Sequence, residues 1–238
     1  MNNTVLHKAD TRGHADHGWL NAYHSFSFAS WYNPDRIQFG MLRVLNDDTV
    51  AAGMGFGTHP HDNMEIITIP LEGDLAHKDS MGNESVIKTG DVQVMSAGTG
   101  IRHSEFNPNA SERTKLFQIW LFPRTQNVAP RYQQITLDTT EQKNNFAQIL
   151  SPNPDDAGVW IHQDAWFHLA DFEAGFAKTY TLKKEGNGLY VFVISGTIKV
   201  DGQELETRDG LGIWNFQYLE FEASTDAKFL LMEIPMEQ

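Results

Sequence analysis

Short runs of hydrophobic residues, separated by glycine, asparagine and aspartate, make up most of the chain. Helix-period patterns are scarce, so these runs predict β-strands rather than helices. The clearest runs are MEIITIPLEG, SVIKTGDVQVMSAG, TKLFQIWLFP, GLYVFVISGTIKVDG, GLGIWNF and AKFLLMEIP. Turn dipeptides such as Asp201 and Gly202 mark hairpins. Regularly spaced short strands with such turns predict a sandwich or a barrel.

A faint internal repeat divides the chain into two similar β units. The stretch MEIITIPLEGDLAHKDSMG can be laid on GLYVFVISGTIKVDG with Gly73 matched to Gly196, and each copy has a strand, a glycine turn and a second strand. A polar stretch that contains Pro130 separates the two units. We therefore expect two domains, residues 1–131 and residues 132–238.

Composition excludes several classes of function. The 238 residues carry a net charge of −13 with histidine neutral, and such an acidic surface repels phosphate backbones. Direct binding to nucleic acid is therefore not expected, whereas a basic protein partner or a neutral small ligand is compatible. The chain has no cysteine, which excludes disulfides, thiolate metal sites and cysteine nucleophiles.

No apolar run approaches the roughly 20 residues that cross a membrane. The N-terminal stretch MNNTVLHKADTRGHADHGW lacks the apolar core of a signal peptide. We therefore expect a soluble, cytoplasmic protein that does not associate with membranes.

His59 and His61 stand one residue apart, directly before the run MEIITIPLEG. Residues two apart on a strand point to the same face, about 6.5–7 Å from each other. Two such imidazoles could bind one ion at about 2.0–2.2 Å. Pro60 between them suits an edge strand or the start of a strand. Taken alone, such a pair is more often an ordinary polar feature of a strand than a metal site.

A second pair, His103 and Glu105, strengthens the case for a metal. It follows the glycine-rich turn at residues 98–100 and has the same two-residue spacing. A barrel would bring the two pairs together around one cavity. Three imidazoles and one carboxylate suit Fe(II), Mn, Ni, Cu or Zn, and four protein ligands would leave two adjacent positions open on an octahedral ion.

The blocks GMGFGTHPHDNMEIITIPLEG and GDVQVMSAGTGIRHSE resemble the two motifs of a cupin barrel. Together with HSFSFASWYNP they resemble the pirin family over essentially the whole chain, and bacterial pirin-like quercetin 2,3-dioxygenases in particular. The resemblance implies an all-β bicupin: two tandem antiparallel β-barrels of the jelly-roll (cupin) type with few short helices. It implies that residues 1–131 form a metal-binding cupin and residues 132–238 a degenerate cupin without metal.

The resemblance also implies a ligand set. Pirins hold their metal with three histidines and one glutamate, and the matching positions are His59, His61, His103 and Glu105. Cupins in general use the glutamate of the first motif, here Glu65, so the sequence leaves the choice open. The His-x-Glu spacing favours Glu105. Glu65 would then orient a ligand or the substrate from outside the ligand set, or be a buried, paired carboxylate with no role in the chemistry.

The second repeat lacks these groups. Counting back from Gly196 places Leu182, Lys184 and Gly188 where the histidines and glutamate of the first motif stand, so one divalent transition metal per chain is expected. Fe(II) is the metal that the resemblance implies, with Cu, Ni, Mn, Co or Zn as alternatives.

The resemblance implies a dioxygenase that uses O2 to open the central ring of a flavonol such as quercetin and releases carbon monoxide. Glu105, or Glu65 beside the site, would accept the proton of the 3-hydroxyl. One alternative is a non-enzymatic regulator that binds a transcription factor or a metabolic enzyme, with the metal as a structural or redox element. Another is a different cupin activity, such as an isomerase or a dioxygenase for another aromatic enol. A monomer is the default expectation.

The remaining histidines and several large apolar residues are expected to be structural. Most of the other histidines should be surface or hydrogen-bonded residues: His7, His14, His17, His77, His162 and His168. His24 is the exception, because it lies in the block HSFSFASWYNP. Phe26, Phe28, Trp31, Met54, Phe56, Met95 and Phe117 are assigned to the core rather than to a substrate site.

Overall fold

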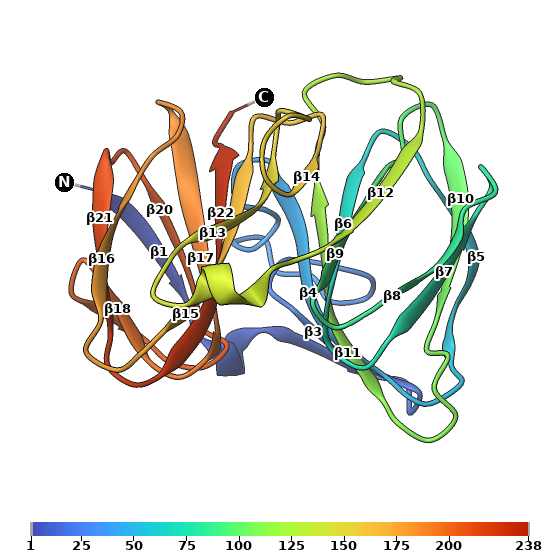
Figure 1. The fold of residues 1–238 in the computed structure, drawn as a ribbon, viewed down its shortest axis with the longest axis horizontal. Helices are drawn as coiled ribbons and strands as arrows, with labels where there is room; N and C mark the ends of the chain where they lie inside the picture. Colours follow the sequence, from blue (N-terminus) through green and yellow to red (C-terminus); the bar gives the residue numbers. More distant parts are fainter. Residues whose placement is uncertain (1, 238) are drawn as a thin grey trace.

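Two β-barrels lie side by side in the molecule (Figure 1). The computed structural model describes residues 2–237. Each barrel combines a seven-stranded sheet with a four-stranded sheet. Within the described residues the helical elements are two short 3-10 helices, η1 (Ala9–Thr11) and η2 (Thr139–Gln142), and no helix there is long and apolar enough to cross a membrane. The all-β prediction with few short helices is confirmed.

The first barrel is built mainly from the first half of the chain. Its strands are β2 (Gly13–Asp16), β3 (Leu20–His24), β4 (Leu42–Val50), β5 (Gly55–His61), β6 (Glu65–Glu72), β7 (Leu75–Asp79), β8 (Glu84–Ile87), β9 (Asp91–Ser96), β10 (Ile101–Phe106), β11 (Thr114–Leu121) and β12 (Arg131–Thr136). The larger sheet has the order β12-β9-β6-β11-β4-β3-β2, and the smaller sheet has the order β5-β10-β7-β8.

The second barrel repeats this arrangement. Its strands are β1 (Asn3–His7), β13 (Ala147–Ser151), β14 (Val159–Trp160), β15 (Trp166–Phe172), β16 (Ala177–Thr181), β17 (Asn187–Ser195), β18 (Ile198–Val200), β19 (Gln203–Leu205), β20 (Gly210–Trp214), β21 (Tyr218–Ala223) and β22 (Ala227–Pro235). The larger sheet has the order β1-β20-β17-β22-β15-β13-β14, and the smaller sheet has the order β16-β21-β18-β19.

The larger sheets of the two barrels pack on each other. Alternate residues of β6 and β11 belong to a hydrophobic core that also includes residues of β17 and β22. The rings of Phe117 and Phe192, one from each barrel, meet edge to face at 5.4 Å. Because one face of these strands lines its own barrel and the other face meets the neighbouring barrel, β6 is buried at six consecutive positions, 65–70.

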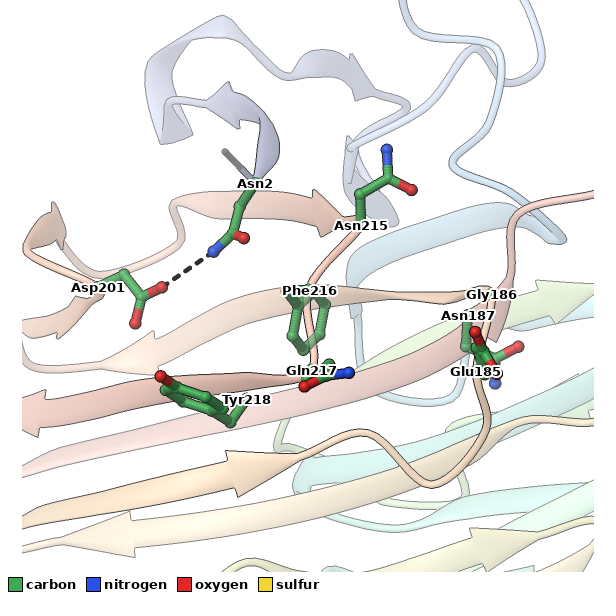
Figure 2. A pocket seen from close by; sticks show the side chains of 9 residues that line it. All are labelled: Asn2, Glu185, Gly186, Asn187, Asp201, Asn215, Phe216, Gln217 and Tyr218. Carbon is green, nitrogen blue, oxygen red and sulfur yellow. Dashed lines mark hydrogen bonds between the residues drawn. The ribbon is translucent and has the colours of Figure 1, made fainter.

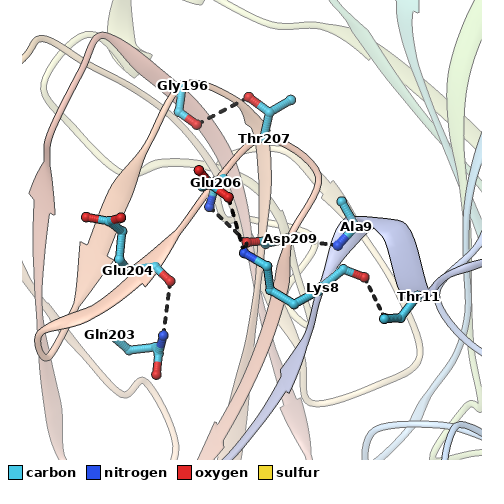
Figure 3. A network of polar contacts seen from close by, with 9 residues as sticks. All are labelled: Lys8, Ala9, Thr11, Gly196, Gln203, Glu204, Glu206, Thr207 and Asp209. Atoms are coloured by element: carbon cyan, nitrogen blue, oxygen red, sulfur yellow. Dashed lines mark hydrogen bonds and ion pairs between the residues drawn. The ribbon is translucent and has the colours of Figure 1, made fainter.

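The N-terminal strand crosses to the second barrel. β1 pairs with β20, from Asn3 opposite Trp214 to His7 opposite Gly210. Just after β1, the ammonium of Lys8 lies 2.5 Å from one carboxylate oxygen of the buried Asp209 (Figure 3). The backbone N–H of Ala9 donates to the other carboxylate oxygen of Asp209. β12 in turn pairs with β9 of the first barrel. The domain division at residues 131 and 132 stays a prediction.

Candidate metal centre

Two strands of the smaller sheet of the first barrel bring three imidazoles together. The antiparallel register of β5 and β10 places His59 directly opposite His103, and His61 shares the face of His59. The ring centroids of His59 and His103 are 4.4 Å apart, and that of His61 lies 4.9 Å from His59 and 5.0 Å from His103. One ring nitrogen of each lies within 4.8 Å of the others, as in a group that could hold one metal ion.

The surroundings of His61 and His103 favour the neutral form of these two imidazoles. Burial, followed by the charge of His59, lowers the pKa of His61 to about 4. Burial and the neighbouring histidines lower the pKa of His103 to about 2. Nδ1 of His59 lies 2.8 Å from the carbonyl oxygen of Gly57, which leaves Nε2 for a ligand. Among the described residues, neither ring nitrogen of His103 has a hydrogen-bond partner. Neutral imidazoles with free nitrogens fit a divalent first-row metal.

Glu105 lies two residues after His103 on the same face of β10. A bulge interrupts the pairing with β5 between these two residues, a device that re-aims side chains near active sites. The Glu105 carboxylate is grouped with His103 and His77, whose candidate ligand atoms lie within 4.8 Å of one another. Gln118 Nε2 donates to both carboxylate oxygens, at 3.1 and 3.3 Å. Burial raises the pKa of Glu105 to about 7. A cation beside it would favour the ionised form.

His77, assigned from the sequence to the structural histidines, lies beside this cluster. In the register of β10 with β7, His77 is opposite Glu105, and Asp79 is opposite His103. His77 Nε2 lies 3.3 Å from a carboxylate oxygen of Asp79, and its Nδ1 is buried without a partner in the part of the chain that the structure describes. The two-residue spacing of His77 and Asp79 is the sequence signal that could have pointed to them.

Glu65 is not brought to the imidazoles. It lies on the face of β6 that carries Ile67 and Ile69 of the core between the barrels. Ser96 Oγ donates to its carboxylate at 2.7 Å. Burial raises the pKa of Glu65 to about 7, while the bond from Ser96 and the charge of Arg131 lower it. This arrangement favours the second expectation for Glu65, a buried and hydrogen-bonded carboxylate.

A cavity of about 430 Å³ opens between the two sheets of the first barrel. Four aromatic side chains line it: Trp19, Phe28, Phe56 and Trp120. Its other lining groups include six polar side chains: His24, Asn46, Asp48, His59, Glu105 and Gln118. Assigning Phe28 to the core was therefore wrong, whereas Phe56 lines the cavity and also packs against a core cluster that includes Leu20 and Leu116. The segment between β3 and β4 carries Phe28 to the cavity, where its ring meets that of Trp120 edge to face at 5.4 Å.

A second cavity, of about 580 Å³, lies on the second barrel (Figure 2). Amide and carboxylate side chains line it together with Phe216 and Tyr218, and Asn2 donates to Asp201 across one side. Its lining, drawn in full in Figure 2, contains no histidine. The larger of these two cavities is therefore not the one that His59 and Glu105 line.

The smaller sheet of the second barrel has apolar side chains at its buried positions. β21 occupies in this sheet the place that β10 occupies in the first barrel. Its buried residues are Leu219, Phe221 and Ala223, which belong to a hydrophobic core, where β10 carries His103 and Glu105. At these strand positions the second barrel therefore has packed apolar side chains where the first barrel has candidate metal ligands.

Two tandem barrels with an imidazole cluster in the first define a two-domain cupin. The chain belongs to the pirin family: the Pirin family model matches residues 5–121, and the model of the quercetinase C-terminal cupin domain matches residues 148–234. The sequence-based resemblance and the bicupin fold are both confirmed.

Individual proteins similar to this chain over nearly its whole length support the family assignment. Quercetin 2,3-dioxygenase of Escherichia coli strain K12 is 43% identical over 234 residues, which cover 97% of this chain and 98% of that protein. The pirin-like protein of Caulobacter vibrioides is 42% identical over 225 residues, which cover 94% of this chain and 96% of that protein.

Among solved structures, the bacterial pirin YhhW of Escherichia coli in complex with nickel(II) matches with a TM-score of 0.93 at 40% identity, covering 98% of this chain and 99% of that one. That complex and the imidazole cluster of this chain together support a metal site of the cupin type.

Proposed function

We propose that this protein is a metal-dependent dioxygenase that opens the central ring of a flavonol such as quercetin. One observation carries the proposal: three clustered imidazoles and the buried Glu105 adjoin an aromatic-walled cavity of about 430 Å³, in a chain similar to proteins named quercetin 2,3-dioxygenase. Both atoms of O2 would enter the product, a depside, and one ring carbon would leave with its oxygen as carbon monoxide.

His59, His61, His103 and Glu105 are the proposed metal ligands. A divalent ion bound there would act as a Lewis acid that stabilises the flavonolate. Fe(II) is the proposed native metal, although the N/O donor set also accepts Cu, Ni, Mn, Co and Zn, and the structure of one relative holds nickel. Metal analysis of protein purified without added metal tests this assignment, and a metal other than iron as the main species would contradict it.

The chain's own groups position the substrate and accept its proton. Glu105, held by Gln118, would accept the proton of the 3-hydroxyl at a carboxylate oxygen. The flat walls formed by Phe28, Phe56 and Trp120 would pack against the flavonol rings and exclude water.

Aerobic turnover of quercetin by metal-loaded protein tests the proposal. His59→Ala should lower kcat/KM at least about a hundredfold, because it removes one of the clustered imidazoles. His14→Ala is the matched control, since His14 is exposed and stacks on Tyr23 away from the cavity. Full activity in His59→Ala would contradict the assigned site. Protein that binds metal but turns over no flavonol would favour the non-enzymatic regulator instead.

A further inference from the structure

Asp48 is a buried carboxyl group in the cavity that the proposed reaction does not use. It lines the cavity with His59 and Glu105, and only 4% of its surface is exposed. Its Oδ1 is buried and has no hydrogen-bond partner among residues 2–237. An unpaired polar oxygen inside a protein is costly, and in a residue that lines a cavity a hydrogen-bonding group of a ligand would satisfy it.

The strand register explains why the protein leaves this oxygen unpaired. Asp48 lies on β4, opposite Ala22 of β3 on one side and Leu116 of β11 on the other. Neither neighbouring side chain can form a hydrogen bond. The pair one step along the sheet is polar by contrast, since His24 Nδ1 and Asn46 Oδ1 lie 2.9 Å apart.

The preceding residue, Asp47, shows the opposite arrangement. It points to the other face of β4, where Arg12 and Arg208 lie 3.1 and 2.9 Å from its carboxylate. Asp47 is thus paired with two cations through one carboxylate oxygen, whereas Asp48 lines the cavity and has a buried carboxyl oxygen without a hydrogen-bond partner among the described residues.

The position of Asp48 along the cavity sets what it can reach. Three residues of β11 that share one face show how far Asp48 lies from the candidate metal ligands. Trp120 meets the ring of His61 at a centroid distance of 4.9 Å, and Gln118 donates to Glu105. Leu116, the third of them, lies opposite Asp48. Each step of two residues is about 6.5–7 Å. Asp48 therefore lies about one two-residue step along the sheet from Gln118, the residue that binds Glu105. A flavonol whose 3-hydroxyl lies at Glu105 would extend an outer ring along the cavity toward Asp48.

We propose that Asp48 is a specificity-determining residue that binds a peripheral phenolic hydroxyl of the flavonol, an inference that rests on the proposed function. Burial raises the pKa of Asp48 well above its usual range, and the charges of Asp47 and Glu105 raise it further. A protonated carboxyl group both donates and accepts, as a phenol does, so the two groups can form a reciprocal pair.

Two flavonols and two variants test this inference. Quercetin carries peripheral hydroxyls, whereas 3-hydroxyflavone lacks them and keeps only the group expected at the metal. Asp48→Leu keeps the size and removes both hydrogen-bonding functions, and Asp48→Asn keeps one donor and one acceptor. Anaerobic binding, followed by quenching of tryptophan fluorescence, and aerobic kcat/KM are measured for both ligands. Asp155→Asn, an exposed loop residue of the second barrel, is the matched control.

Asp48→Leu should weaken quercetin binding about tenfold or more and leave 3-hydroxyflavone binding within about twofold. Asp48→Asn should recover part of the loss. Metal content should stay unchanged in both variants. The melting temperature without ligand should equal or exceed that of the wild type, because an unpaired buried carboxyl group is removed.

Equal losses for both ligands, or no loss for quercetin, would overturn the role of Asp48 while leaving the proposed reaction intact. A wild-type protein that binds neither flavonol would overturn the proposed function and this inference together.

Discussion

At the scale of single residues, the candidate centre depends on groups outside the four proposed ligands. Gln118 holds the carboxylate of Glu105, and Asp79 holds the ring of His77 next to it. Burial lowers the pKa of His77, which favours a neutral ring whose Nδ1 is free to meet a neighbour. Such outer partners fix the orientation of metal ligands and tune their basicity.

Replacing His77 with alanine should weaken metal binding about 10–100-fold, because the ring lies against both His103 and Glu105. Competition with a metal-binding indicator measures the affinity independently of turnover. His14→Ala serves as the control, since it removes an exposed imidazole. A metal affinity equal to that of the wild type would contradict a role of His77 in supporting the metal ligands.

The sequence predicted the proposed ligands more readily than their partners. His59 and His61, and likewise His103 and Glu105, have a spacing that places each pair on one face of a strand. Which strand faces meet depends on the register between strands, and the spacing of residues in the sequence does not determine that register. His77 and Asp48 were not singled out for this reason: their importance follows from what lies opposite them in the sheet.

At the scale of strands, the cluster requires a close approach of β5 to β10. A Cβ atom on Gly55 would lie 2.2 Å from the carbonyl oxygen of Glu105 and 2.5 Å from the Cα of Phe106. A Cβ on Gly57, two residues along the same strand, would have nothing within 4 Å. These two glycines of one strand therefore have different roles.

Gly55→Ala should destabilise the protein by about 1–3 kcal/mol and weaken metal binding, because β5 must move away from β10. Gly57→Ala, the matched control, should change the free energy of unfolding by no more than about 0.5 kcal/mol. Chemical denaturation and metal titration of both variants provide the comparison. Similar effects at the two positions would contradict the described register.

The hydrophobic runs predicted where strands occur in the sequence, but they did not predict which strands pair with each other. On β21 the buried residues are apolar and alternate with exposed ones, which is the period-two pattern that a sequence displays, whereas β10 buries His103 and Glu105 and exposes Phe106. The pairing of β1 with β20 joins the two ends of the sequence, and no local pattern specifies it. The continuous burial of β6 likewise depends on the neighbouring barrel.

At the scale of the whole molecule, the two barrels share one hydrophobic core. Phe117 is fully buried against Phe192 of the other barrel. Phe117→Ala should cost about 3–5 kcal/mol of unfolding free energy, and both barrels should still unfold in one transition. Tyr218→Ala, at an exposed position, is the control.

Denaturant unfolding followed by both circular dichroism and tryptophan fluorescence measures this coupling. Two separate transitions in the wild type would contradict a shared core. The two-barrel architecture was predictable because the repeat places a second glycine turn at Gly196. The monomeric state and a protein partner stay predictions.

The most direct test of the central claim is the yield of carbon monoxide per quercetin consumed. Metal-loaded wild-type protein in air should release one molecule of carbon monoxide for each quercetin and each O2 consumed. Metal-stripped protein and His59→Ala should release essentially none. Consumption of quercetin without carbon monoxide, or equal yields from loaded and metal-stripped protein, would contradict a metal-dependent flavonol dioxygenase.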